Sequence, residues 1–257
     1  MKEERYFYDP NLSGELPQEE AHHAVKVLRL QAGDEIRLMD GRGTFCRAEI
    51  TAVANHHCRY RILDKDVPPR DWEGHLHLAM APTKLMERVE WLAEKATEIG
   101  FDALTFLDCR FSERRTVKEE RIEKILVAAM KQSHKPFLPA LHPMISFDEF
   151  VHTPREGDKF ICHCYPPYDI GEGSAKPHLA SLLRRGVPTT VLVGPEGDFS
   201  IDEVRLAESL GFRSVTLGRS RLRTETAALV AVHLMQFANA ADEAYFPTNL
   251  TSPNNDV

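Results

Sequence analysis

Long apolar runs are missing from this 257-residue sequence. No segment approaches the roughly 18 apolar residues that a membrane-spanning helix needs, and the first ten residues contain no signal-peptide core. We therefore expect a cytoplasmic protein with no membrane contact. The 42% apolar content still allows a sizeable packed core and excludes an intrinsically disordered chain.

Cysteine is scarce as well, and none of the five cysteines belongs to a C-x-x-C pair of the zinc-binding or redox kind. Cys162, His163 and Cys164 lie together, but on a strand the two sulfurs would face away from the imidazole. A metal at this position is a minor alternative. We expect reduced structural thiols and no metal site.

Positive charge is in deficit, because 39 acidic residues outnumber 32 basic ones and give a formal net charge of -7. A nucleic-acid partner requires Lys and Arg on the contacting face, so this net charge argues mildly against one. Local clustering of basic residues can override the net charge.

The first quarter of the chain has the pattern of a small all-β unit. Apolar residues alternate with a period of two from Glu35 to Leu63, around an Asp-Gly-Arg-Gly turn at 40–43. A short helical pattern at 19–30 precedes this unit, and the Val-Pro-Pro-Arg segment at 67–70 marks a boundary. We predict one domain at residues 1–70, a second at 73–244 and a disordered tail at 245–257.

The second domain alternates strands and helices. Apolar periodicity predicts helices at 83–99 and 118–133 and a last apolar helix at 227–241, with Gly100 ending the first of them. This order is typical of an α/β fold in which helices cover both faces of a parallel sheet. The strands are expected at residues 75–81, 103–107, 159–164, 190–193 and 214–217.

Two motifs late in this domain indicate a function. The first, VGPEGDFS at 193–200, joins a buried strand to a helix whose start has the capping-box spacing Ser200 to Glu203. It places two glycines and a helix N-terminus at the carboxyl edge of the sheet, where open α/β sheets bind ligands. A plain strand-to-helix turn is the alternative, and the lack of a following Gly-Lys-Ser/Thr excludes a P-loop.

The second motif, LGRSRLRTETA at 217–227, brings three arginines and a glutamate together before an apolar helix. As a purely structural feature it would be a helix start, with Thr224 as the N-cap and Glu225 stabilised by the helix dipole. That interpretation explains the threonine and the glutamate but leaves the arginines unexplained.

Together the two motifs resemble the paired signature of the SPOUT methyltransferases, and most of all the ribosomal RNA small subunit methyltransferase E family. The resemblance extends over nearly the whole chain. Its further elements are Arg5-Tyr6-Phe7, His22-His23, Val27-Leu28-Arg29, Lys84-Leu85-Met86-Glu87, Thr97-Glu98-Ile99-Gly100 and Lys131-Gln132-Ser133.

This resemblance implies a PUA-like β-barrel followed by a catalytic domain whose C-terminal part is threaded into a trefoil knot. It further implies a homodimer that uses S-adenosylmethionine to methylate N3 of a uridine in 16S ribosomal RNA. The cofactor would lie in the knot, in contact with Leu192, Gly194, Pro195, Glu196, Gly197, Leu217, Gly218, Leu222 and Thr226.

Three residues depart from the pattern of that family, which commonly has Gly in place of Asp198, Ile in place of Arg221 and Glu in place of Lys131. The first two lie in the expected cofactor loops. Asp198 would either supply an acceptor for the ribose or cap the following helix. Lys131, together with Lys135, would add positive charge to an RNA-facing surface.

Methylation at uracil N3 requires removal of the imide proton, after which negative charge spreads to O2 and O4. An arginine beside the ring would stabilise this charge, and a carboxylate or an ordered water would accept the proton. Arg223 and Glu225 are therefore the candidate catalytic residues. Glu225 has a second interpretation, as a helix cap or as the structural partner of an arginine.

Contacts with RNA are expected from a basic loop at 110–121 that contains one aromatic residue, Phe111. Nearby glutamates partly cancel its charge, so a solvated charged surface is the alternative. The candidate RNA-binding residues are Arg5, Lys26, Arg29, Arg110, Arg114, Arg115, Lys131 and Lys135.

Two competing functions belong to other classes. A non-catalytic RNA-binding module would need only the small β unit and the basic loop, and cofactor binding distinguishes it from an enzyme. A nicotinamide dehydrogenase is disfavoured because Gly171-Glu172-Gly173 lies well beyond a strand and lacks the rest of the glycine fingerprint. The sequence leaves open the exact uridine, the proton acceptor, and whether naked RNA replaces the expected assembled small subunit as substrate.

Overall fold

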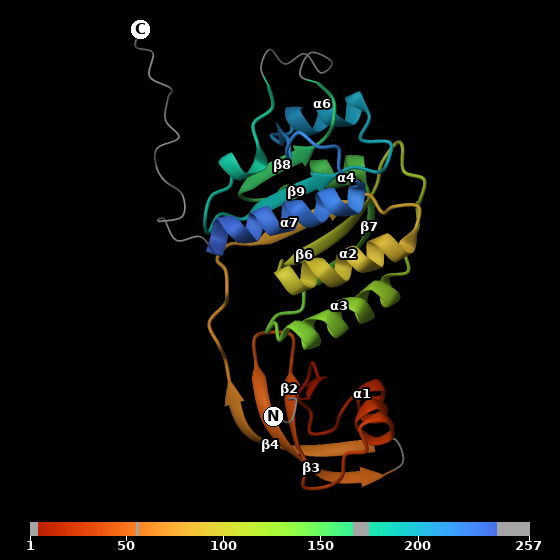
Figure 1. Ribbon diagram of the computed structural model, residues 1–257, viewed down its shortest axis with the longest axis vertical. Coiled ribbons are helices and arrows are strands. Elements are labelled where there is room, and N and C mark those ends of the chain that lie inside the picture. Colours follow the sequence, from red (N-terminus) through yellow and green to blue (C-terminus); the bar gives the residue numbers. More distant parts are fainter. Residues whose placement is uncertain (1–4, 55–56, 167–174, 241–257) are drawn as a thin grey trace.

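The computed structural model describes residues 5–54, 57–166 and 175–240. Its strands form a four-stranded sheet in the order β1-β2-β3-β4 and a six-stranded sheet in the order β10-β8-β9-β5-β6-β7. In Figure 1 the four-stranded sheet lies below the six-stranded one, and helix α3 lies between them. The expected tail at 245–257 and the Gly-Glu-Gly segment at 171–173 fall outside the described residues.

The small sheet confirms the all-β unit predicted from alternation. Strand β2 (Glu35–Met39) pairs antiparallel with β3 (Phe45–Ala54), which pairs antiparallel with β4 (His57–Asp66). The sequence did not reveal β1 (Tyr6–Tyr8), which pairs parallel with β2. Because side chains alternate between the two faces of a strand, Cys46, Ala48 and Ile50 of β3 all face a buried core beneath these strands.

One helical segment covers this core, and it is shorter than the sequence predicts. Helix α1 (Gln18–His22) continues into one π-helical stretch, η1 (His23–Val27). Arg29 then takes a left-handed backbone conformation with φ of 56°. The helical pattern at 19–30 therefore ends before Leu28, and the remaining residues form the connection to β2.

The six-stranded sheet confirms the predicted α/β fold, because every strand pair in it is parallel. The central strands β5 (Leu76–Met80) and β9 (Thr189–Val193) are almost entirely buried, which accounts for their continuous apolar runs. Strand β7 was not predicted. The remaining strands are β6 (Ala103–Asp108), β7 (Ala140–Ser146), β8 (Asp158–Cys162) and β10 (Arg213–Val215).

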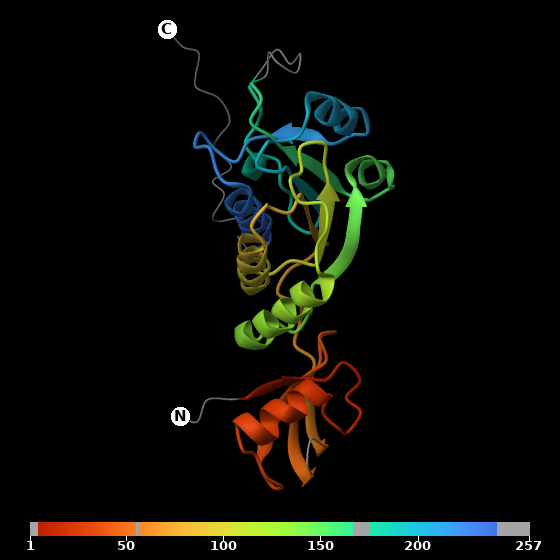
Figure 2. The same ribbon diagram turned by 90° about the vertical axis from the view of Figure 1, so that its right-hand side faces the viewer.

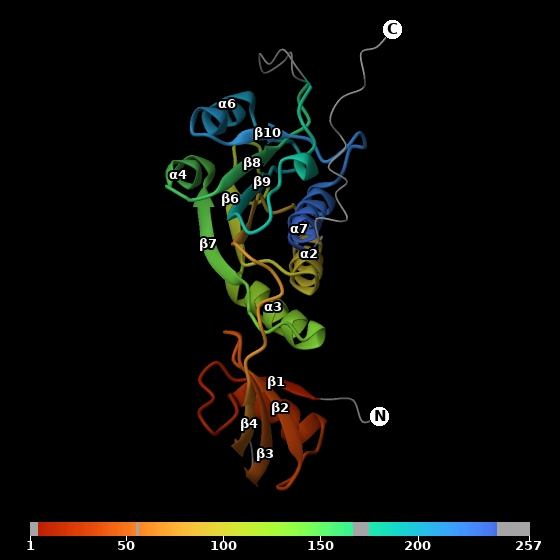
Figure 3. The same cartoon turned by 90° about the vertical axis from the view of Figure 1, so that its left-hand side faces the viewer.

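Helices cover both faces of this sheet, as expected (Figure 3). One apolar cluster packs α2 (Met86–Ile99), α3 (Glu119–Ser133), α7 (Thr224–Ala240) and the short 3-10 turn η2 (Leu179–Ser181) against one face. A second cluster packs α4 (Phe147–His152) and α6 (Ile201–Ser209) against the other. No helix in the described part of the chain has the length and apolar character to cross a membrane.

The helix boundaries show which local signals were reliable. Helix α2 ends at Gly100, whose φ of 110° only glycine adopts easily, and α6 begins with the predicted capping box between Ser200 and Glu203. Two starts were misplaced. Helix α2 begins at Met86 and not at 83, and α7 begins at Thr224 and not at 227.

Figure 2 shows the region where the two sheets meet, and backbone hydrogen bonds and ion pairs join them there. The amide of Gly43 donates to the carbonyl of Pro136 at 2.9 Å, and the amide of Leu138 donates to the carbonyl of Gly41 at 2.9 Å. Ion pairs join helix α1 to helix α3. They are Glu19 with Lys124 and Glu20 with Lys131.

Candidate active site

The first motif forms a tight loop between β9 and α6. Gly194 and Pro195 are buried, and the amide of Asp198 donates to the carbonyl of Pro195 at 2.9 Å, which closes a turn. A Cβ atom on Gly194 would lie 3.0 Å from the Phe199 ring, and one on Gly197 would lie 3.2 Å from Cβ of Phe111. Both positions therefore leave little space for a side chain.

Asp198 joins this loop to the end of the neighbouring strand β8. Its φ of 67° is left-handed, a conformation that glycine adopts freely and aspartate tolerates. Its carboxylate accepts a 2.8 Å hydrogen bond from the amide of Cys164 and a 2.8 Å hydrogen bond from the amide of Phe199. Ser200 is the N-cap of α6, so the expectation that Asp198 caps this helix was wrong.

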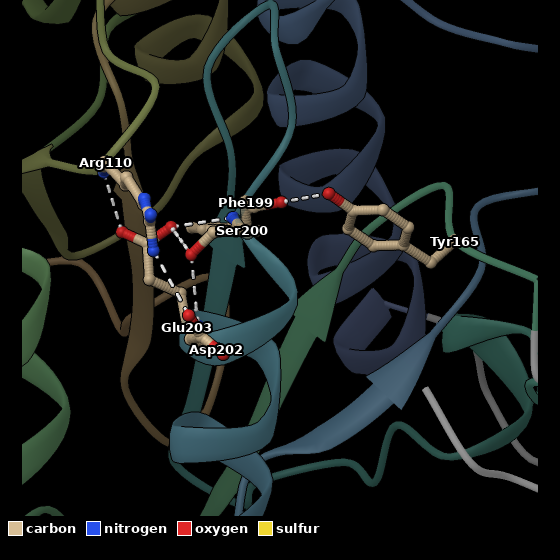
Figure 4. Close-up of polar contacts among 6 residues, drawn as sticks. All are labelled: Arg110, Tyr165, Phe199, Ser200, Asp202 and Glu203. Atoms are coloured by element: carbon tan, nitrogen blue, oxygen red, sulfur yellow. Dashed lines mark hydrogen bonds and ion pairs between the residues drawn. The ribbon is translucent and has the colours of Figure 1, made fainter. Parts of the chain in front are cut away.

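The start of α6 ties the motif to the basic loop (Figure 4). Glu203 accepts the amide of Ser200 at 2.7 Å with one carboxylate oxygen and the amide of Arg110 at 2.8 Å with the other. The guanidinium of Arg110 also pairs with Asp202 at 3.1 Å. The loop that begins at Arg110 is thereby attached to the helix that follows the first motif.

The second motif leaves its backbone open. Gly218 has a φ of 130°, and a Cβ atom there would meet nothing within 4 Å. The hydroxyl of Thr216 donates to the carbonyl of Gly218 at 2.9 Å and fixes the start of the loop. The arginine side chains of this loop, Arg219, Arg221 and Arg223, are exposed.

Glu225 lies in the first turn of α7 and is 7% exposed. Its Oε1 atom lies 3.6 Å from Nε of Arg88, in the first turn of α2, and its Oε2 atom has no hydrogen-bond partner among the described residues. The amide of Ala227 donates to the carbonyl of Arg223 at 2.8 Å, which makes Arg223 the N-cap residue. The assignment of Thr224 as N-cap was wrong by one position.

A segment at the start of α2, residues 83–88, connects the two motifs. The amide of Lys84 donates to Glu196 of the first motif at 2.9 Å, and Arg88 pairs with Glu225 after the second. The guanidinium of Arg114 donates to the carbonyls of Thr83 and Lys84 and holds the segment in place. The structure therefore brings the two motifs together at the carboxyl edge of the sheet, although β8 separates β9 from β10.

Comparison with known proteins identifies what this arrangement belongs to. Residues 70–236 match the family model of the RNA methyltransferase domain, and residues 16–63 match that of the RNA methyltransferase PUA domain. The chain belongs to this RNA methyltransferase family. The resemblance inferred from the two motifs is confirmed.

Relatives support the assignment over most of the methyltransferase. It is 28% identical over 226 residues to the ribosomal RNA small subunit methyltransferase E of Bacillus subtilis, covering 85% of this chain and 88% of that protein. A probable rRNA methyltransferase from Porphyromonas gingivalis has 38% identity and a TM-score of 0.84, with coverage of 92% and 98%. Ribosomal RNA small subunit methyltransferase E from Neisseria gonorrhoeae, bound to S-adenosyl methionine, has 28% identity and a TM-score of 0.79, with coverage of 91% and 97%.

The candidate RNA-binding residues of the methyltransferase fall into three separate groups. Arg5, Lys26 and Arg29 are exposed on the N-terminal part. In the basic loop, Arg110 pairs with Asp202, Arg115 pairs with Asp108, and Arg114 binds the α2 segment. Lys131 and Lys135 lie at the junction of the sheets, where Lys131 pairs with Glu20 and Lys135 pairs with Asp71.

Lys131 therefore does not add free positive charge to an open surface, contrary to expectation. Its side chain is 24% exposed and that of Glu20 is 12% exposed, so the pair is mostly removed from solvent. The replacement of the glutamate common in the family by Lys131 is explained by this contact. A glutamate at this position would face Glu20 with like charge.

The surroundings of Cys162, His163 and Cys164 are those of structural residues. Burial raises the pKa of Cys162 to about 12, and it lowers the pKa of His163 to about 3 with a further contribution from nearby Lys176. The ring of His163 hydrogen-bonds the hydroxyl of Ser214 at 2.9 Å. Residues 5–54, 57–166 and 175–240 contain no cluster of three or more His, Cys, Asp or Glu arranged to hold a metal.

Arg88 is the residue that the sequence motifs missed. The family pattern at 84–87 ends immediately before it, and its partner Glu225 lies far away along the chain. Arg88 lies in the first turn of α2, where the helix dipole disfavours a cation unless a partner compensates, but the predicted start at residue 83 placed it in the second turn and hid this signal. The identity of that partner depends on the packing of α2 against α7 and could not be inferred locally.

Proposed function

We propose that this methyltransferase transfers the methyl group of S-adenosylmethionine to N3 of a uridine in 16S ribosomal RNA, with the assembled small subunit as substrate. The observation that carries the proposal is the buried Glu225 carboxylate, one oxygen of which has no hydrogen-bond partner among the described residues. Glu225 comes after the open backbone at Gly218 and two residues after Arg223, an exposed arginine. The names of the relatives supply the substrate class.

The residues of the two loops fit the cofactor. Gly194 and Gly197 add no side chains of their own to the first loop, and the open backbone at Gly218 allows close approach of a ligand. S-adenosylmethionine, when bound, supplies an electrophilic methyl group on a positively charged sulfur. The proposed contacts are Leu192, Gly194, Pro195, Glu196, Gly197, Leu217, Gly218, Leu222 and Thr226, and we propose that the chain around them forms a trefoil knot.

The chain itself supplies the proton chemistry. Arg223 has no ion pair among the described residues, and its guanidinium is free to approach the uracil oxygens on which negative charge develops. Oε2 of Glu225 accepts the imide proton from N3. The N-terminus of α7 adds favourable potential for the anionic carboxylate before this transfer.

We further propose that RNA is held by two of the three basic groups. Arg5, Lys26 and Arg29 on the small domain and Arg110, Arg114 and Arg115 in the basic loop contact phosphates, because phosphate contacts position an RNA without reading its sequence. The domain division at residues 1–70 and 73–244 gives each group its own domain. A homodimer in the bacterial cytoplasm completes the proposal.

The experiment has two measurements. Isothermal calorimetry measures binding of S-adenosylmethionine, which distinguishes an enzyme from a non-catalytic RNA-binding module. Mass spectrometry of 16S ribosomal RNA from a strain lacking the gene identifies the missing methylated nucleotide, and purified small subunits from that strain test its restoration. A strain whose 16S ribosomal RNA retains every N3-methylated uridine would contradict the proposed substrate.

A further inference from the structure

The contact between Arg88 and Glu225 involves only one of the two carboxylate oxygens of Glu225. Nε of Arg88 lies 3.6 Å from Oε1, which makes an ion pair but exceeds ordinary hydrogen-bond length. The Glu225 side chain is 9% exposed and that of Arg88 is 33% exposed. Oε2 is buried and finds no donor within the described part of the chain, although buried carboxylate oxygens are nearly always hydrogen-bonded.

The two carboxylate oxygens of Glu225 therefore have different roles. The cation of Arg88 and the N-terminus of α7 both favour the anionic carboxylate and fix it through Oε1. Oε2 keeps its full capacity to accept a hydrogen bond. Because an unsatisfied buried acceptor destabilises the protein alone, the missing donor is best supplied by a bound reactant.

The position of Arg88 is itself defined by both motifs. It lies in the first turn of α2, shortly after Lys84, whose amide is bound to Glu196 of the first motif. The hydroxyl of Thr83 donates to the carbonyl of Leu85 at 2.9 Å and shapes the same segment. The start of α2 thus holds the first loop at one end and Glu225 at the other.

We propose that Arg88 is a positioning residue, which holds the Glu225 carboxylate so that Oε2 points at the imide N–H of the target uracil. This inference rests on the proposed role of Glu225 as proton acceptor. In the step, Oε2 takes the N3 proton and the electron pair of the N–H bond forms the new bond from N3 to the methyl carbon. The carbon–sulfur bond breaks and its pair stays on sulfur, so the products are methyluridine, S-adenosylhomocysteine and protonated Glu225.

The test compares Arg88→Gln, Arg88→Lys, Glu225→Gln and the double variant Arg88→Gln/Glu225→Gln with the wild type. Single-turnover methylation of small subunits is measured at saturating S-adenosylmethionine, beside calorimetric cofactor affinity and melting temperature. Lys95→Gln is the matched control, because Lys95 is a cation of the same helix that pairs with Glu94 and Glu98. Arg88→Met, which keeps the aliphatic part of the side chain, replaces Arg88→Gln if that variant does not fold.

We expect Arg88→Gln to lower the single-turnover rate on the order of 10- to 100-fold, as for loss of a group that orients another. Arg88→Lys recovers part of the rate, Lys95→Gln keeps it, and cofactor affinity is unchanged in all three. The double variant is no slower than Glu225→Gln alone, because Arg88 acts through Glu225.

Two results overturn the inference and leave the proposed function intact. One is a wild-type rate in Arg88→Gln beside a slow Glu225→Gln. The other is a loss of cofactor affinity in Arg88→Gln with an unchanged rate at saturation, which assigns Arg88 to cofactor binding. A wild-type rate in Glu225→Gln instead contradicts the proposed role of Glu225, and with it the basis of the inference.

Discussion

Arg223 and Glu225 lie close together on the chain in opposite surroundings. The side chain of Arg223 is exposed at the N-cap of α7, whereas Glu225 is buried in the first helical turn. An exposed cation can follow a substrate that enters from solvent, and a buried carboxylate is held in one orientation. The two side chains are thus suited to different steps, stabilisation of charge by Arg223 and acceptance of a proton by Glu225.

We therefore expect removal of Arg223 to slow methyl transfer in a way that depends on pH. We expect Arg223→Ala to raise the barrier to methyl transfer by about 2 to 4 kcal/mol, the cost of removing one donor to a developing anion. Higher pH rescues part of this loss, because it supplies the N3 anion directly. Single-turnover methylation between roughly pH 6 and pH 10 measures both effects.

Arg219→Ala is the matched control, since Arg219 is an exposed arginine of the same loop with no proposed catalytic role. It removes the same charge and keeps the rate near that of the wild type. A wild-type rate for Arg223→Ala at neutral pH would show that Arg223 has no part in catalysis.

We expect two histidines, the buried His163 and the partly buried His77, to make the stability of the protein sensitive to acid. Burial lowers the pKa of His77 and of His163 from 6.5 to about 3, with further contributions from Arg155 and Lys176 respectively. Between these values the unfolded chain binds more protons than the folded protein, so stability falls as the pH drops from 6.5 toward 3. Melting temperatures measured across this range are expected to decrease. His163→Gln should reduce the slope, and a melting temperature independent of pH in the wild type would refute the explanation.

At the scale of elements, the first loop depends on the basic loop packed against it. We expect Gly197→Val to weaken binding of S-adenosylmethionine strongly, because its side chain would displace Phe111, which lies 3.2 Å from the position of a Cβ atom. Calorimetry measures the affinity, and an unchanged melting temperature shows that the fold is intact. Adding Phe111→Ala is expected to restore part of the affinity by making room. Undiminished affinity in Gly197→Val would contradict the placement of the cofactor.

The elements predicted correctly are those with strong local signals. The buried runs of β5 and β9, the capping box at Ser200 and the glycine end of α2 all follow from patterns within a few residues. Strand β7 was missed because it is an edge strand that contains Pro143 and is mostly exposed, so it shows no apolar alternation.

The site was only partly predictable for a different reason. Both loops and the pair of catalytic candidates lie in contiguous motifs, and those could be read in order along the chain. The contacts of Arg88 with Glu225, of Asp198 with Cys164 and of Lys131 with Glu20 join distant segments. They depend on which helices and strands pack together, and no pattern of residues within one segment encodes that.

At the scale of the whole molecule, α7 and α2 carry exposed apolar side chains on neighbouring helices. Phe237 of α7 is 41% exposed and Trp91 of α2 is 43% exposed. A second copy of the chain would cover such residues in an isologous contact. We expect the protein to be a dimer by light scattering at micromolar concentration, and Phe237→Asp to shift it toward the monomer.

Val27→Asp is the matched control, because Val27 is 60% exposed on the small domain and outside these helices. It should leave the dimer intact. A wild-type protein that is monomeric at this concentration and fully active would contradict the homodimer.

The junction between the two sheets has a consequence for how a target is found. Hydrogen bonds of Gly41 and Gly43 in the 40–43 turn and the ion pairs of α1 with α3 join the N-terminal domain to the rest of the protein. These contacts fix the distance between the RNA-binding residues proposed on the N-terminal domain and the cofactor loops. If Arg29 binds RNA as we propose, the nucleotide presented to the methyl donor is the one at this fixed distance along the RNA, so distance as well as base would select the target. Weakening this junction is then expected to broaden the choice of nucleotide before it slows methyl transfer.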